Sequence, residues 1–509
     1  MKMGKVYIAG AGCGDFDLMT LKLKSLIEES ECIVYDRLVN KEILKLAPCG
    51  AELIYLGKED CEGGLLQEEI NATLIKKAKE GKDVLRLKGG HPFVFGRGGE
   101  EALALVAEDI KFDIIPGVTS AISVPAYAGI PVSHRGINTS FHIFTGHTKK
   151  DGKAIDYETV AKLEGTLVFL MGVKNIGKIS SGLINNGKIS STPVAVIENG
   201  STCHQRTVVG TLETITKIVE EEKVKSPSII IVGEVVNLRE QLSWFENKTL
   251  HGQKVLVTAE KSKSKPLSRL IRSLGGESME FPLFEMSAID FNIPNLKTFN
   301  TIAFTSPQSV HAFFKKIDNI RDLNHLSIGV AGEKTHEALK EYKLTANIKC
   351  KVYRTSSMLS AISHIKGDDD IILLVTSSHS YIDKKEYKNP IYQLETYQIE
   401  RIMRAKKVVK DILEESSIVT FSNACTAQML LDAVDGETKL FTKKQIVALN
   451  KTTADKLELL GLHVNAIGDN FISEKTFEEC MLDKEKGIQN NDMDYRGNKG
   501  FTHPCRKAG

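Results

Sequence analysis

The chain has 509 residues, of which 42% are hydrophobic and 26% are charged, and its formal net charge is +2. This length predicts three or four domains, and the composition is typical of a soluble globular protein. A net charge this small excludes an overall attraction to nucleic acid or to a membrane, so an acidic ligand must meet a local group of basic side chains. The nine cysteines include no C-x-x-C pair, which predicts reduced thiols in a cytoplasmic protein and no metal site.

Residues 1–116 alternate short apolar strands with amphipathic helices. The segments "KVYIAGAG", "CIVYD", "DVLRLKGG" and "FDIIPG" predict strands, and "LMTLKLKSLIEES" and "QEEINATLIKKAKEG" predict helices. This order predicts a parallel sheet in an α/β subdomain. Ligands of such sheets bind beyond the carboxyl ends of the strands, where the glycine-rich loops of this segment fall.

Residues 117–245 predict a second α/β subdomain, built on a mixed sheet. Its strands are expected at "SFHIFTGHT", "GTLVFLMG", "PVAVIENG", "QRTVVGTL" and "SIIIVGEVV". A short polar stretch at 246–253 then predicts a linker before the new strand "KVLVTAE".

The second half contains a weak internal repeat. The segments "TIAFTSPQSVHAFFKKI" and "SIVTFSNACTAQMLLDAV" share one plan of apolar strand, Ser/Thr turn and helix, and each is followed by a second such unit. This predicts two similar α/β lobes. The last segment, 481–509, is polar and rich in Gly and Asn, which predicts a disordered tail.

The turn "AGAGCGDFD" follows the first strand and leaves three interpretations open. Gly10 and Gly12 match the first two glycines of the dinucleotide fingerprint G-x-G-x-x-G, but Asp15 stands in the third position. Asp36 ends the second strand, where an acidic residue could bind a ribose. The turn therefore predicts an adenosyl cofactor other than NAD, or NAD itself, or only a tight strand-to-helix turn.

The stretch "GGHPFVFGRGGEE" is more specific. Gly89 and Gly90 would let a ligand approach the backbone closely, and Arg97 and Glu100 lie across a second glycine turn that opens a helix. A purely structural loop with a solvated Arg–Glu pair is the alternative, but few structural loops need so many glycines.

The first half resembles a known family. The motifs "VYIAGAGCGD", "YDRLV", "RLKGGHPFVFGRGGEE", "IPGVTSAISVPAYAGIPVSHRG", "LVFLMG" and "ENGS" are similar, in order, to those of uroporphyrinogen-III C-methyltransferases, over about residues 4–245. The resemblance implies a tetrapyrrole-methylase fold of two α/β subdomains and a homodimer formed through this half. It also implies two S-adenosylmethionine-dependent methylations of uroporphyrinogen III, which give precorrin-2.

The same resemblance implies roles for individual residues. Asp36 and Lys58 match catalytic acid–base positions, and Arg97, Glu100 and Arg135 match substrate-binding positions. A catalytic base role has also been considered for Arg97, but carboxylate binding suits a guanidinium better. The expected cofactor contacts, many of them through the backbone, are Cys13, Gly89, Gly90, His91, Val94, Thr119, Ser120, Met171 and Gly200.

Three residues depart from the family pattern. Cys13 stands where proline is usual, His91 where aspartate is usual, and Glu59 where a basic residue is usual. The first two changes are compatible with backbone contacts to the cofactor. The third removes positive charge near a polyanionic substrate and is expected to change either the affinity for that substrate or the surroundings of Lys58.

The second half is similar to uroporphyrinogen-III synthase over about residues 251–480, through "FTSPQSV", "VAGEKT", "ETYQIE" and "FSNACTAQ". This implies a two-lobed fold, with lobe 1 at 254–285 and 398–480 and lobe 2 at 286–397, that closes hydroxymethylbilane into uroporphyrinogen III without a cofactor. Tyr397 resembles the tyrosine that assists loss of the hydroxyl. Ser306, Ser422 and Thr452 are predicted to bind substrate carboxylates, with helix N-capping as the alternative.

Other functions remain open from the sequence. Gly10, Gly12 and Asp36 also fit an NAD-dependent oxidoreductase. The departures at Cys13, His91 and Glu59 also fit a non-catalytic tetrapyrrole-binding protein. A methylase of a later corrin intermediate is a further alternative, which the attached synthase-like half disfavours.

Overall fold

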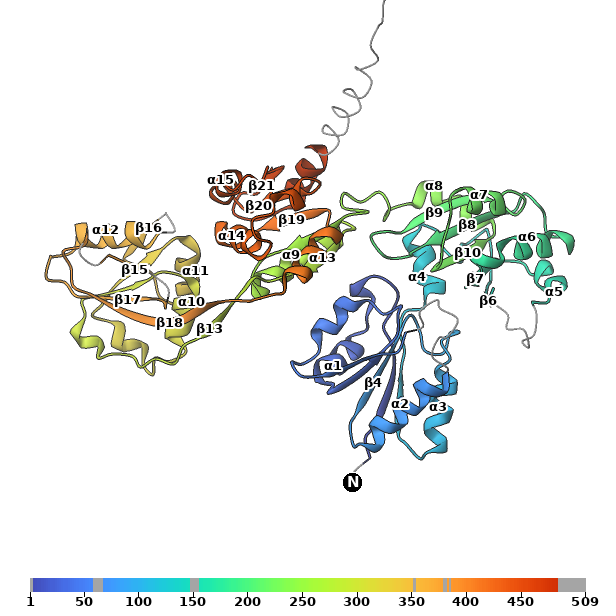
Figure 1. Cartoon of the computed structure of the whole chain (residues 1–509), viewed down its shortest axis with the longest axis horizontal. Helices are drawn as coiled ribbons and strands as arrows, with labels where there is room; N and C mark the ends of the chain where they lie inside the picture. Colours follow the sequence, from blue (N-terminus) through green and yellow to red (C-terminus); the bar gives the residue numbers. More distant parts are fainter. Residues whose placement is uncertain are drawn as a thin grey trace, which may run out of the picture.

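The computed structural model describes residues 3–57, 67–146, 155–350, 354–378, 382–383 and 386–483. Four sheets organise these residues, two in each half of the chain. Figure 1 shows the lobe that carries α9 and α13–α15 between the other synthase-like lobe and the methylase-like half. The predicted tail at 481–509 lies outside the described residues from 484 onward.

The first sheet is entirely parallel, as the alternation of strands and helices predicts, and has the order β3-β2-β4-β1-β5. Its helices α2 and α3 cover one face and α1 covers the other. The elements are β1 Val6–Gly10, α1 Leu21–Glu29, β2 Cys32–Tyr35, β3 Glu52–Tyr55, α2 Gln67–Lys79, β4 Val84–Lys88, α3 Gly98–Ala107 and β5 Phe112–Ile115.

The second sheet is mixed, also as predicted, with the order β6-β7-β10-β8-β9. Only β6 and β7 pair in parallel. Helix α4 packs on one face and α5–α7 on the other. The elements are α4 Ser120–Tyr127, β6 Phe141–Thr145, α5 Tyr157–Lys162, β7 Thr166–Leu170, α6 Ile176–Asn185, β8 Pro193–Glu198, β9 Arg206–Thr211, α7 Ile215–Glu221, β10 Ser228–Val232 and α8 Arg239–Leu242.

Lobe 1 of the second half has a parallel sheet in the order β12-β11-β19-β20-β21. Because the strands are parallel, their carboxyl ends meet at one edge of the sheet. The elements are β11 Lys254–Val257, α9 Lys261–Ser273, β12 Glu277–Glu280, α13 Lys406–Glu415, β19 Ile418–Phe421, α14 Ala424–Ala433, β20 Gln445–Ala448, α15 Lys451–Leu459 and β21 Ala466–Ile467.

Lobe 2 has the order β13-β18-β17-β14-β15-β16, in which only β13 and β18 pair antiparallel. The chain passes between the lobes on β13 and β18, so the expected boundaries at 286 and 397 fall inside these two strands. The elements are β13 Phe284–Ala288, β14 Thr301–Phe304, α10 Pro307–Phe314, β15 Ser327–Ala331, α11 Glu333–Glu341, β16 Ile348–Cys350, α12 Thr355–Ile365, β17 Ile372–Ser377 and β18 Ile391–Arg401.

The stretch expected to be a linker is packed between the halves. Leu250 is fully buried, the backbone N–H of Gly252 donates to the carbonyl of Cys203 at 2.8 Å, and His251 Nε2 lies 2.8 Å from the carbonyl oxygen of Gln205. Lobe 1 also contacts the first subdomain, because Arg272 Nε of α9 forms an ion pair with Asp17 Oδ2 at 2.9 Å. These contacts fix lobe 1 against both subdomains of the first half. No helix in the described part of the chain is long and apolar enough to cross a membrane.

Candidate active sites

A cavity of about 2300 Å³ lies where the first two subdomains meet lobe 1. Its floor comes from the loops that follow β1, β2 and β4, at the carboxyl ends of the first sheet. Ligands of parallel sheets bind at this edge. The cavity is lined by every residue of the expected cofactor set, namely Cys13, Gly89, Gly90, His91, Val94, Thr119, Ser120, Met171 and Gly200.

Three glycines make a close backbone crossing under this cavity. A Cβ on Gly10 would fall 2.4 Å from the carbonyl oxygen of Gly90, and one on Gly117 would fall 2.3 Å from the same atom. Gly12 and Gly90 also exchange backbone hydrogen bonds at 3.3 and 2.6 Å. Gly90 itself has φ +68°, and its missing Cβ would meet nothing nearer than the backbone N of Ser120, at 3.9 Å. The backbones are therefore tightly packed at Gly10 and Gly117, whereas the space beside Gly90, where its Cβ would stand, is open.

The ring of His91 stabilises its own loop. Its Nδ1 accepts a hydrogen bond from the backbone N–H of Phe93 at 3.1 Å. A short acceptor side chain that bonds the N–H two residues onward is typical of Asx-type turns. An aspartate, the usual family residue at this position, could make the same bond, so the departure at His91 preserves the turn.

Cys13 is held between the two subdomains. Its Sγ lies 2.6 Å from Ser123 Oγ on α4, and its carbonyl accepts a hydrogen bond from Ser201 Oγ at 2.5 Å. Burial raises the pKa of the Cys13 thiol. The protonated thiol therefore serves as a packing and hydrogen-bonding group, which a proline could replace only in part.

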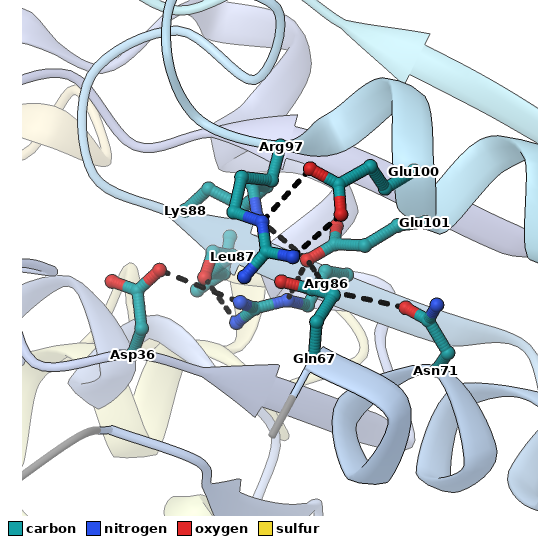
Figure 2. A network of polar contacts seen from close by, with 9 residues as sticks. All are labelled: Asp36, Gln67, Asn71, Arg86, Leu87, Lys88, Arg97, Glu100 and Glu101. Carbon is teal, nitrogen blue, oxygen red and sulfur yellow. Dashed lines mark hydrogen bonds and ion pairs between the residues drawn. The ribbon is translucent and has the colours of Figure 1, made fainter. Parts of the chain in front are cut away.

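A buried ionic network lies beneath the same loops (Figure 2). Arg86 and Lys88 are two residues apart on β4, so they point to the same face of the sheet. Lys88 Nζ donates to Glu101 Oε1 at 2.6 Å, and Arg86 Nε donates to the same oxygen at 3.3 Å. Glu101 is fully buried, and Arg86 is 2% exposed. Burial, followed by the charge of Arg86, lowers the pKa of Lys88.

Asp36 joins this network from the end of β2. Arg86 Nη2 lies 3.5 Å from Asp36 Oδ2, while Asp36 Oδ1 is buried without a partner in the described residues. Asp36, Arg86 and Lys88 all line the cavity. Because the Asp36 side chain is 27% exposed and lines the cavity, its carboxylate can meet a ligand there. The sequence interpretation missed Arg86, Lys88 and Glu101, although the basic alternation in "LRLK" was a signal for them.

Arg97 and Glu100 form a bidentate pair at the start of α3. Arg97 Nε and Nη2 donate to the two carboxylate oxygens of Glu100, at 2.8 and 2.5 Å. An arginine offers five N–H donors, so three remain for another anion. Arg97 lines the cavity, whereas Glu100 is exposed and is not among the lining residues. The structure thus brings Arg97, but not Glu100, to the cavity wall.

Two further predicted residues are not placed at the cavity. Lys58, with the departure at Glu59, lies outside the described residues. Arg135 is exposed on the segment between α4 and β6 and does not line the cavity.

The NAD interpretation does not fit this geometry. In a dinucleotide-binding fold the glycine turn opens directly into a helix whose N-terminus faces the pyrophosphate. Here Asp15 accepts a hydrogen bond from the Tyr127 hydroxyl at 2.7 Å, and α1 begins only at Leu21. The strand order also differs from the Rossmann order, because β1 lies between β4 and β5.

One group of metal-ligand types occurs in the described part of the chain, at the junction of the halves. The ligand atoms of Cys203, His204 and Glu277 lie within 4.8 Å of one another. The Cys203 thiol donates to Glu277 at 3.5 Å, and burial together with the Glu277 charge raises its pKa to about 12. In this arrangement the thiol is a hydrogen-bond donor to the carboxylate of Glu277.

In the second half, the structure brings Ser306 and Tyr397 together. Their hydroxyl oxygens lie 3.0 Å apart, and both residues are buried. Ser306 follows β14 and also caps α10, because its Oγ accepts from the N–H of Ser309 at 3.1 Å. The capping alternative therefore holds for Ser306 alongside the contact with Tyr397.

Ser422 and Thr452 occupy different positions from Ser306. The N-cap residues of α14 and α15 are Asn423 and Asn450, whose side chains accept from Thr426 N and Thr453 N at 2.9 and 3.0 Å. Ser422 and Thr452 are therefore not the capping residues. Both lie at the edge of lobe 1 where the parallel strands end, and Thr452 is exposed.

Comparisons with known proteins divide the chain in the same way as the sheets. A family model of tetrapyrrole (corrin/porphyrin) methylases matches residues 5–216, and a model of uroporphyrinogen-III synthase HemD matches residues 265–477.

The first half resembles both a curated relative and a solved structure. An S-adenosyl-L-methionine-dependent uroporphyrinogen III methyltransferase of Methanosarcina barkeri is 53% identical over 241 residues, 47% of this chain and 94% of the relative. The solved structure of the uroporphyrin-III C-methyl transferase of Thermus thermophilus complexed with S-adenyl homocysteine is 37% identical, with a TM-score of 0.41, and the match covers 46% of this chain and 94% of that one.

One relative matches the whole length. The porphyrin biosynthesis protein HemD of Ruminiclostridium josui is 35% identical over 510 residues, which cover 95% of this chain and 98% of the relative. The chain therefore belongs to this porphyrin-biosynthesis family, with a tetrapyrrole methylase as its first half and a uroporphyrinogen-III synthase as its second.

Proposed function

We propose that the second half closes hydroxymethylbilane into uroporphyrinogen III and that the first half methylates this product twice to give precorrin-2. The chain is an S-adenosylmethionine-dependent methyltransferase and a synthase in one polypeptide. The observation that supports the first activity best is the assembly of nine expected cofactor positions, from separate segments, around one cavity with Asp36 and Arg97.

The residues of this cavity fit S-adenosylmethionine. The cofactor supplies, when bound, a methyl group on a sulfonium that a pyrrole carbon can attack. The open face at Gly90 admits a ligand against the backbone, and the N–H groups near Thr119 and Ser120 begin helix α4. We assign the binding of the adenosyl group to this backbone, with Val94 and Met171 as apolar walls.

Asp36 is our candidate for the base. Attack by a pyrrole carbon makes the ring more acidic, so a proton must be lost for the macrocycle to regain a neutral form. The carboxylate of Asp36, which lines the cavity, can accept it, and Arg86 Nη2 lies 3.5 Å from its Oδ2. Lys58 remains a second predicted acid–base residue.

Arg97 is our candidate for binding the substrate carboxylates. Its pair with Glu100 fixes the plane of the guanidinium and leaves three N–H donors for an acetate or propionate group. Glu100 then acts as a positioning residue. The substrate-binding role of Arg135 stays a prediction.

In the synthase half, Tyr397 is our candidate for assisting loss of the hydroxyl from hydroxymethylbilane. Its hydroxyl, oriented by Ser306 at 3.0 Å, would donate a hydrogen bond to the leaving oxygen. Ser422 and Thr452, at the facing edge of lobe 1, would bind carboxylate groups of the same substrate.

The proposal is tested by anaerobic incubation of the pure protein with hydroxymethylbilane and S-adenosylmethionine. Formation of the dimethylated product, identified by mass and absorbance, supports both activities. If neither hydroxymethylbilane nor added uroporphyrinogen III yields that product, the proposal fails and a non-catalytic tetrapyrrole-binding protein becomes the better interpretation. Calorimetry with NADH and with S-adenosylhomocysteine separately tests the cofactor.

We also propose that the protein works in the cytoplasm as a homodimer formed through its first half, as the family resemblance implies. Light scattering after gel filtration measures the mass. A monomer at the concentrations used for assay would contradict the dimer.

A further inference from the structure

Helix α9 of lobe 1 presents a row of cations to the methyl-transfer cavity. Lys265, Arg269 and Arg272 are spaced by four and three residues, so they lie on one face of the helix over about 10 Å. All three line the same cavity as Gly90, Asp36 and Arg97. Side chains from the synthase half therefore form part of the wall of the methyltransferase site.

The orientation of this helix is fixed by its other face. Ser264 Oγ and Ser268 Oγ donate to the two carboxylate oxygens of Glu280 on β12, at 2.8 and 2.7 Å. Ile271 is fully buried in the core of lobe 1. These contacts keep the basic face turned away from the lobe and towards the cavity.

The positive charge of this row is only partly compensated within the protein. Arg272 pairs with Asp17 at 2.9 Å, and its guanidinium lies over the ring of Phe16. Lys265 and Arg269 are exposed and have no ion-pair partner among the described residues. The nearby acidic groups are engaged elsewhere, since Glu280 binds the two serines and Glu277 accepts from Cys203. Lys265 and Arg269 are thus left to meet an external anion.

The row also has a direction. Helix α9 begins after β11, at the sheet edge that carries Ser422 and Thr452, because β11, β19 and β20 run parallel. It ends near Asp17, at the glycine turn of the methyltransferase half. The helix therefore leads from the edge of lobe 1 that carries Ser422 and Thr452 to the cavity of the first half.

We propose that Lys265, Arg269 and Arg272 form a transfer surface that passes uroporphyrinogen III from the synthase half to the methyltransferase half without release. The ligand carries acetate and propionate groups around its whole ring, so it can exchange one guanidinium or ammonium partner for the next as it moves. The proposal rests on the two activities proposed above and adds that the second half helps to deliver the substrate of the first.

The test uses the full chain and isotope dilution. Labelled hydroxymethylbilane is supplied with S-adenosylmethionine and an unlabelled pool of uroporphyrinogen III. Direct transfer gives early precorrin-2 with a higher specific radioactivity than the uroporphyrinogen III pool. The measured quantity is the ratio of the two specific radioactivities. It therefore does not depend directly on how fast either half turns over. Raising the ionic strength is expected to lower the enrichment, since salt screens exposed charges.

The variant Lys265→Glu/Arg269→Glu is expected to lose the enrichment. The matched control is Lys407→Glu/Lys443→Glu, which reverses two charges at exposed positions of the same lobe that do not line the cavity. The control is expected to keep the enrichment.

Two outcomes would overturn the transfer surface. One is that the unsubstituted protein gives precorrin-2 with only the specific radioactivity of the uroporphyrinogen III pool. The other is enrichment that persists in Lys265→Glu/Arg269→Glu. Both are distinguishable from failure of the proposed function, in which no precorrin-2 forms from either substrate.

Discussion

Glu101 is fully buried beneath the loop after β4, and two cations share one of its oxygens. A buried charge is tolerated only when it is paired, because transfer from water costs several kcal/mol per ion. The three side chains therefore act as one buried network, formed by Arg86, Lys88 and Glu101. Through Arg86 this network also holds Asp36 at the cavity wall.

Replacing Glu101 by Gln should leave Lys88 buried without a counter-ion and Arg86 with only its 3.5 Å contact to Asp36. The expected loss is about 3–5 kcal/mol of the free energy of unfolding of the first half. Trp244 is the single tryptophan and packs against Tyr127 in that half, so its fluorescence during urea unfolding of the full chain measures the effect.

The matched control is Glu100→Gln on the same helix. Glu100 is exposed and pairs with Arg97 near the surface, so its replacement is expected to cost less than about 1 kcal/mol. Equal losses in the two variants would show that the buried network does not stabilise the fold more than a surface pair does.

Gly90 allows a second prediction about a single residue. An alanine there would be strained by about 1–2 kcal/mol, because φ is +68°, but its Cβ would meet no protein atom closer than 3.9 Å. The Cβ would instead enter the open space beside Gly90, where the cofactor is proposed to bind. Gly90→Ala is therefore expected to weaken S-adenosylhomocysteine binding at least tenfold in calorimetry while the protein still folds. Unchanged affinity would remove this face from the cofactor site.

Strand β3 and helix α2 are joined by a charge cluster that makes this pair of elements sensitive to acid. Glu52 on β3 accepts from Lys77 at 2.7 Å and from Lys82 at 2.8 Å. The hydrogen bonds from Lys77 and then Lys82 lower the pKa of Glu52 from 4.5 to about 2. A carboxyl group whose pKa is lowered on folding stabilises the protein fully above its unfolded pKa and loses that contribution as the pH falls through its folded pKa.

The parent protein is therefore expected to melt at a higher temperature than Glu52→Gln at neutral pH, and the difference should shrink as the pH falls from 4.5 towards 2. The difference will be modest because Glu52 is partly exposed. Melting curves of both proteins across this range measure it. A constant difference at every pH would mean that the ion pairs contribute nothing.

How well an element could be predicted from the sequence depended on its burial. The central strands β1, β2 and β4 are continuous apolar runs apart from Arg86 and Lys88, and the sequence predicts them. Strand β3 was missed because it is a short edge strand whose residues alternate between partly buried and exposed, so it has no continuous apolar run. The loops that line the cavity could be predicted from their glycines. The network of Arg86, Lys88 and Glu101 could not, because it depends on how α3 packs over β4.

The turns of the second half show the same limit. Each Ser/Thr turn was expected to bind a carboxylate or to cap a helix. The structure shows that Asn423 and Asn450 are the caps beside Ser422 and Thr452, whereas Ser306 both caps α10 and contacts Tyr397. Which of several neighbouring polar residues caps a helix depends on backbone dihedrals that local composition does not determine.

In the whole molecule, the two proposed catalytic sites belong to different subdomains, so each activity is expected to be removable without the other. Arg97 lies at the start of α3 in the first subdomain, and Tyr397 lies on β18 in lobe 2. Tyr397→Phe removes the hydroxyl that contacts Ser306. It is expected to slow cyclisation of hydroxymethylbilane by at least tenfold, as loss of a positioned proton donor does. Methylation of added uroporphyrinogen III should be retained.

Arg97→Ala is the reciprocal variant. It removes the guanidinium at the cavity wall. The transition-state free energy of methylation, obtained from the ratio of kcat/KM values, is expected to rise by about 1.5–3 kcal/mol, the contribution of a hydrogen bond to a charged group. Cyclisation should continue, so uroporphyrinogen III should accumulate when hydroxymethylbilane is supplied. Chromatography of the products of both variants measures the two steps side by side. Equal loss of both activities in either variant would mean that the halves do not act as independent catalysts joined by the packed segment around Leu250.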